Sequence, residues 1–127
     1  AITEEMGAPA SMSYDIQTET GVGHTQAHLE YARTNLLDEP IGEYGQLLKE
    51  PIGVCVLITP WNWPINQIIC KVIPALLAGC TMVLMTSELT PIFAQLVAGE
   101  AIPIGASLFE SNMFFKRSIS ADLIEIF

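Results

Sequence analysis

Residues 51–64, PIGVCVLITPWNWP, decide the fold of this chain. The first part, 51–58, is a continuous apolar run rich in Val and Ile, which is typical of a parallel strand covered on both faces. Two tryptophans, two prolines and an asparagine then fall within 58–64. Pro64 suits the first position of a helix, because a missing backbone N–H costs nothing there. The stretch therefore predicts a buried strand that passes through a short loop into a helix.

A second strand completes the unit. The helix is predicted over 65–79, where Gly79 is a natural stop and the internal Pro74 should kink or shorten it. The apolar run CTMVLM, 80–85, is the second strand. Strand, helix and strand across 52–85 have the length of one βαβ unit, so both strands should be parallel.

The loops after the two strands are predicted to share one edge of the sheet. In open parallel sheets, ligands bind beyond the carboxyl ends of the strands. Residues 58–62 and 85–88 both lie at such ends. We therefore expect the Trp/Asn/Pro loop and the MTSE loop to face one ligand crevice.

The part of the chain before this unit is predicted to be mainly helical over 1–37. Apolar side chains recur there at helical spacing, at Val22, Leu29, Ala32 and Leu36. We expect Gly21 and Gly23 to interrupt or begin this helix, and residues 38–42 to form a break.

Three further segments are assigned from their patterns. EYGQLLKE, 43–50, is predicted to be a strand that extends from the body. A short helix is expected to start near Thr90, and the pattern of 111–127 favours a helix because breakers are few.

Composition excludes some classes of partner. The chain has 127 residues, 50% of them apolar and 15% charged, with a net charge of -9. The length fits one domain. The negative charge argues against nucleic acid, because phosphates would be repelled. The apolar run 52–84 is interrupted by prolines, Asn62, Asn66 and Lys71, so we do not expect it to span a membrane.

Cysteine and histidine usage predicts no metal site and no disulfide framework. The three cysteines form no CxxC motif, and His24 and His28 have no evident third ligand, so we interpret both histidines as surface residues. The N-terminus is acidic and polar, unlike a signal peptide, and a cytoplasmic location is expected.

The segment 49–91, KEPIGVCVLITPWNWPINQIICKVIPALLAGCTMVLMTSELTP, closely resembles the NAD(P)-dependent aldehyde dehydrogenase family, and EEMGAP, 4–9, fits the same family. The resemblance implies an α/β fold: a partial Rossmann-like cofactor-binding domain with N-terminal helices and one βαβ unit. Residues 1–127 would be part of that domain. Within it, 43–50 would begin an arm that pairs subunits, and 92–127 would be a divergent tail.

The resemblance also implies the site. Complete family members oxidise an aldehyde to a carboxylic acid with NAD or NADP. Asn62 matches the residue whose amide donates to the oxyanion, and Glu88 matches the acid that accepts from the adenosine ribose hydroxyls. Lys71 matches a lysine usually found in the helix after the loop. The cofactor cleft would be lined by Ile58, Thr59, Pro60 and Trp61.

Departures from the family pattern limit the expected activity. Met85 and Thr86 stand where the family usually carries Lys and Pro before the acid, so a cationic ribose contact is missing. The segments with the catalytic Cys and the general-base Glu are not found, and none of the local cysteines lies beside an activating group. We therefore expect this chain alone to be inactive.

Alternatives stand beside these assignments. Asn62 is also suited to capping the following helix, and Glu88 to the first turn of the next one. Trp61 and Trp63 also suit packing anchors, and Lys71 also suits a buried helix from which its amine reaches water. A non-enzymatic protein that pairs with intact homologous subunits is the alternative function. The succinate-semialdehyde and betaine-aldehyde branches are not separated.

Overall fold

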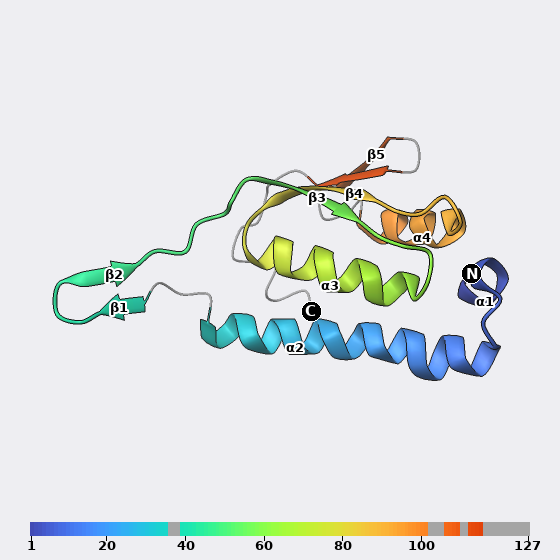
Figure 1. Cartoon of the computed structure of the whole chain (residues 1–127), viewed down its shortest axis with the longest axis horizontal. Helices are drawn as coiled ribbons and strands as arrows, with labels where there is room; N and C mark the ends of the chain where they lie inside the picture. Colours follow the sequence, from blue (N-terminus) through green and yellow to red (C-terminus); the bar gives the residue numbers. More distant parts are fainter. Residues whose placement is uncertain (36–38, 102–105, 110–111, 116–127) are drawn as a thin grey trace.

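The computed structural model describes residues 1–35, 39–101, 106–109 and 112–115, which form an α/β fold (Figure 1). The N-terminal part contains α1 (Ile2–Met6), the π-helix η1 (Met12–Thr18) and α2 (Glu19–Asn35). After them come β1 (Glu39–Ile41), β2 (Gly45–Leu47), β3 (Val54–Ile58), α3 (Pro64–Leu77), β4 (Thr81–Met85), α4 (Pro91–Ala101), β5 (Ala106–Phe109) and β6 (Asn112–Phe115). The sheet, α3 and α2 lie in three successive layers in Figure 1.

The βαβ unit is confirmed. β3 and β4 pair in parallel, from Val54 opposite Thr81 to Ile58 opposite Met85. Pro64 occupies the first turn of α3, as predicted, and the chain turns after the helix at Gly79, whose φ is 72°. α3 continues past Pro74 for less than one turn, because it ends at Leu77.

The sheet extends beyond the predicted unit. Its order is β3-β4-β6-β5, and β6 pairs antiparallel with β4. The helix favoured over 111–127 is therefore wrong for residues 112–115, while 116–127 lie outside the described residues. Aromatic residues suit strands, and this strand satisfies the backbone groups along the second edge of β4.

The two glycines near position 22 do not interrupt the N-terminal helix, as had been expected. Helical structure runs without a break from residue 10 to residue 35. Gly21 instead permits α2 to lie close to α3, because a Cβ atom there would be 3.1 Å from Cγ1 of Ile65. Gly21 is therefore explained by helix packing and not by a break, whereas no close contact explains Gly23.

The predicted strand over 43–50 is present only at 45–47. It pairs with 39–41, which had been expected to be part of a break, and the two form an antiparallel hairpin. Gly42 permits the turn with a φ of 63°. All six strand residues are exposed, and the hairpin projects away from the body in Figure 1.

The expectation that β3 is covered on both faces is wrong for this structure. Cys55 and Leu57 pack against the core, whereas Val54, Val56 and Ile58 are 70%, 60% and 67% exposed. β3 lies at the edge of the sheet, and α3 covers one face of the unit.

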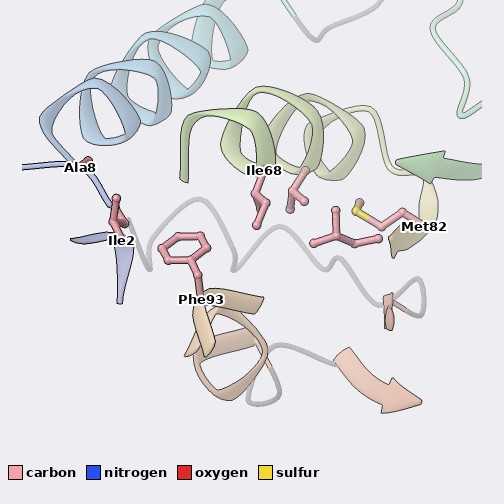
Figure 2. Packing of buried hydrophobic residues seen from close by; sticks show 7 residues of the cluster. Ile2, Ala8, Ile68, Met82 and Phe93 are labelled. Carbon is pink, nitrogen blue, oxygen red and sulfur yellow. The ribbon is translucent and has the colours of Figure 1, made fainter. Parts of the chain in front are cut away.

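The core lies between the sheet, α3 and the ends of α1 and α4 (Figure 2). Met82 and Leu84 of β4 are almost fully buried against α3. The cluster also includes Ile2, Ala8, Ile68, Val72 and Phe93. In the described part of the chain, no helix has an apolar stretch long enough to cross a bilayer.

One polar side chain is enclosed beside this core without full hydrogen bonding. Gln17 of η1 is fully buried, and its Nε2 donates to Sδ of Met6 at 3.7 Å. Its Oε1 has no hydrogen-bond partner. A buried acceptor without a donor costs free energy, so Gln17 lowers the stability of this helix junction.

We predict that Gln17→Met raises the free energy of unfolding by about 1 kcal/mol, because Met has a similar shape and no orphaned acceptor. Urea denaturation measures the change. Gln26→Met on the exposed face of α2 is the matched control and should stay within about 0.5 kcal/mol of the wild type. A marked loss of stability in Gln17→Met would contradict the assignment.

Candidate functional site

The loops after β3 and β4 begin side by side at the carboxyl edge of the sheet. Ile58 and Met85 are the last paired residues of the two strands. The N–H of Thr59 then donates to the backbone oxygen of Met85 at 3.0 Å, which extends the contact one residue beyond β3. The common edge expected from the sequence is therefore present.

The first loop is fixed by an unusual backbone conformation. Trp63 has a φ of 56° and a ψ of 52°, and among the described residues it alone combines a positive φ with a Cβ atom. Such left-handed residues cost about 1 kcal/mol or more and often occur at functional sites. Trp63 is the N-cap of α3, and its oxygen accepts from Gln67 N at 3.0 Å.

The interpretation of Asn62 as a helix cap is not supported. α3 has no side-chain hydrogen bond at its N-cap, and Asn62 is exposed one residue before it. Trp61 is also 46% exposed and is not a buried packing anchor. The Asn62 amide thus remains available to a ligand.

The other predicted lining residues divide into two groups. Ile58 and Pro60 are exposed at the edge. Thr59 differs, because its residue is only 4% exposed and its N–H is already bonded to β4. Thr59 holds the loop and offers little side-chain surface to a ligand.

The second loop is a compact turn around Ser87. Its Oγ accepts from Leu89 N at 3.2 Å, and its backbone oxygen accepts from Thr90 N at 3.1 Å. The polar stretch TSELTP, 86–91, predicts a turn here, and only the part that the Ser87 hydroxyl plays in it was not predicted. Glu88 is exposed on this turn, and no ion pair holds it among the residues described.

Lys71 does not join Asn62 and Glu88. It lies two turns into α3, about 10 Å along the helix from its start. Its Nζ donates to Oε1 of Gln67 at 3.1 Å, and the side chain is half-buried. This placement agrees only in part with the alternative in which its amine reaches water from a buried helix, because the amine bonds to Gln67 of the same helix.

No cation balances Glu88 in the described part of the chain. Arg33 pairs with Glu30, and Lys49 pairs with Glu39. Met85 stands where the family pattern usually has a lysine, and it is 41% exposed and uncharged. Of the two loops that follow β3 and β4, the described residues therefore present the Glu88 carboxylate, the Asn62 amide and several exposed apolar side chains.

The cysteines lack the features of a nucleophile. Burial raises the pKa of the Cys55 thiol, and a hydrogen bond with the Cys80 thiol adds to the rise, so less reactive thiolate forms. Cys80 is buried at the start of β4, and Cys70 donates to Oδ1 of Asn66 at 3.5 Å. None of the three forms a disulfide, and none belongs to the loop that contains Asn62.

Two other features do not provide a site. Where the structure describes the chain, no three metal-ligating side chains converge, and Nδ1 of His28 donates to the oxygen of His24 at 2.7 Å. A hollow of about 500 Å³ lies at the opposite, amino edge of the strands. It is lined by Glu50, Pro51, Gly53, Gly79 and Thr81.

Comparisons with known proteins agree with this geometry. The model of the aldehyde dehydrogenase family matches residues 1–105. A 3-succinoylsemialdehyde-pyridine dehydrogenase from Pseudomonas sp is 50% identical over 99 residues, which cover 77% of this chain and 20% of that protein. The crystal structure of an aldehyde dehydrogenase from Bartonella henselae is 47% identical, with a TM-score of 0.68, over 77% of this chain and 21% of that chain.

The chain thus spans about a fifth of the length of these relatives. The family model covers most of its residues, and the parallel strands with their paired loops provide the matching fold. By sequence and by structure, this chain belongs to the aldehyde dehydrogenase family.

Proposed function

We propose that this chain forms part of the cofactor-binding domain of an aldehyde dehydrogenase, in which Glu88 binds the adenosine ribose and Asn62 donates to the oxyanion. One observation carries the proposal. The Thr59–Met85 hydrogen bond joins the ends of two parallel strands, so the Asn62 and Glu88 loops leave the sheet together. The carboxyl edge of a parallel sheet is where such folds bind nucleotides.

The residues at this edge fit a dinucleotide. The exposed Glu88 carboxylate has acceptor oxygens for two vicinal hydroxyls. Ile58, Trp61 and Met85 expose apolar surface nearby, which suits the faces of an adenine ring. NAD or NADP, when bound, supplies the hydride acceptor for aldehyde oxidation.

Asn62 supplies the polar chemistry of the site. Its amide N–H can donate to an oxygen that becomes negative as a thiol adds to an aldehyde. The left-handed Trp63 fixes the backbone next to it. In a complete enzyme, one such donor is worth about 10²- to 10³-fold in kcat.

The charges favour NAD over NADP. A carboxylate at the ribose accepts from a 2′-hydroxyl but repels a 2′-phosphate. Met85 offers no compensating cation. A cytoplasmic location is part of the proposal, because three free thiols suit a reducing compartment.

We predict that NADH binds the chain and that Glu88→Gln weakens this binding about tenfold, because a neutral amide is a poorer acceptor for the diol. Met85→Lys should improve NADPH binding more than NADH binding. Quenching of tryptophan fluorescence, with Trp61 at the edge, measures the dissociation constants. Glu43→Gln in the exposed hairpin turn is the control. Equal affinity of Glu88→Gln and the control would contradict the ribose assignment.

We also propose that the chain does not oxidise aldehydes by itself, because none of its three thiols is activated. Purified chain with NAD and a panel of aldehydes should show no steady rise in the absorbance of reduced nicotinamide. A rise that is lost on replacing Cys55, Cys70 or Cys80 by Ser would overturn this proposal.

A second candidate function is non-enzymatic pairing with homologous subunits. The hairpin of β1 and β2 favours it, because its apolar side chains face outward: Ile41 is 59% exposed and Leu47 is 43% exposed. Tyr44 at the turn is 97% exposed. An exposed edge strand with apolar residues is a ready template for another strand.

We predict that the chain co-purifies with a full-length aldehyde dehydrogenase homologue through this hairpin. Ile41→Asp combined with Leu47→Asp should reduce the captured amount at least about tenfold, because buried charges oppose an apolar contact. Val22→Asp, on the exposed side of α2, is the matched control. Undiminished capture by the hairpin variant, or none by the wild type, would exclude this function.

A further inference from the structure

The first turn of α4 is capped by a residue from the other end of the chain. The N–H groups of Ile92 and Phe93 donate to the two carboxylate oxygens of Glu5, at 2.5 Å and 3.0 Å. These residues are 87 and 88 positions apart from Glu5. One carboxylate therefore satisfies two adjacent donors at the positive end of the helix.

No residue next to the helix supplies this cap. Pro91 occupies the first position and has no N–H to satisfy. Thr90 is of a type that often caps helices, but its hydroxyl donates to the oxygen of Ser87 at 3.4 Å. The start of α4 consequently depends on Glu5.

Glu5 itself is held in place. Its N–H donates to the oxygen of Ala1 at 2.9 Å within α1. Ile2 of the same helix is buried in the core cluster that contains Phe93 of α4, and Figure 2 shows the two side chains approaching each other. The Glu5 carboxylate thus belongs to α1, which is held in the core by Ile2, and it binds the first turn of α4, which is held in the same core by Phe93.

This contact lies at the end of the loop that carries Glu88. The loop leaves β4, whose last residue is tied to Thr59, and it ends where α4 begins. We propose that Glu5 is a positioning residue: by capping α4 it holds the Glu88 turn at the carboxyl edge of the sheet. The part of this inference that concerns cofactor affinity rests on the proposed function.

Hydrogen–deuterium exchange of the whole chain tests the positioning. In Glu5→Gln, the amides of Leu89, Thr90, Ile92 and Phe93 should exchange about five- to tenfold faster, which is the loss expected for one helix cap. Glu4→Gln is the matched control, because Glu4 lies next to Glu5, is exposed and pairs with the N-terminal amine at 3.2 Å. Equal exchange in the two variants would overturn the proposal.

Cofactor affinity provides the second readout. NADH binding should weaken about threefold in Glu5→Gln, and the double variant Glu5→Gln/Glu88→Gln should bind no more weakly than Glu88→Gln alone. Additive losses would show that Glu5 does not act through the Glu88 turn. If the wild-type chain does not bind NADH, the proposed cofactor site fails, while the exchange comparison still decides whether Glu5 holds the loop.

Urea unfolding separates this local effect from a general loss of structure. Should Glu5→Gln not fold, Glu5→Asp replaces it, since Asp keeps the charge and both oxygens on a side chain shorter by one methylene group. Faster exchange confined to residues 87–93 in Glu5→Asp supports the proposal, and exchange equal to that of Glu4→Gln contradicts it.

Discussion

The parallel pairing of β3 with β4 is the constraint on which the rest of the structure depends. The register from Val54 opposite Thr81 to Ile58 opposite Met85 brings both strands to an end at one edge. The hydrogen bond from Thr59 to Met85 continues this pairing into the loop. Because the crossover helix must return the chain to the start of the second strand, α3 is placed over one face, and the core forms between them. We assign side chains to the site because they lie at this common edge, and not because they line a preformed cavity.

Special backbone positions then adjust the layers and loops around that pairing. Gly21 allows α2 to approach Ile65 of α3. Gly79 turns the chain from α3 into β4 at a φ of 72°. Trp63 adopts a comparable conformation with a large side chain, which costs more than it would for glycine. The strained conformation of Trp63 therefore fixes the backbone next to Asn62, which suits a loop that must orient the Asn62 amide.

The βαβ unit could be predicted from the sequence because local signals agree there: an apolar run, Pro64 at a helix start and Gly79 after its end. The remaining differences involve pairing or packing partners that local patterns do not reveal, and most of these partners are distant in the chain. Residues 39–41 become a strand only through pairing with 45–47, and 112–115 only through pairing with β4. Gly21 is explained by Ile65, and the cap of α4 by Glu5. For the site, the common edge was predictable from topology, whereas the buried Thr59 and the separation of Lys71 required coordinates.

Asn62 and Glu88 are both exposed, and this exposure affects the roles proposed for them differently. A carboxylate can accept hydrogen bonds from a ribose at an open edge, so the contribution of Glu88 needs no further cover. The value of Asn62 as an oxyanion donor depends instead on excluding water, because hydrogen bonds to a developing charge are strongest in a dry site. Asn62 is exposed here, and β3 presents an uncovered apolar face beside it. Under the proposed function, the open edge is therefore sufficient for the Glu88 contact to a nucleotide, whereas the Asn62 contact to an oxyanion gains its catalytic effect only when another protein surface covers the loop.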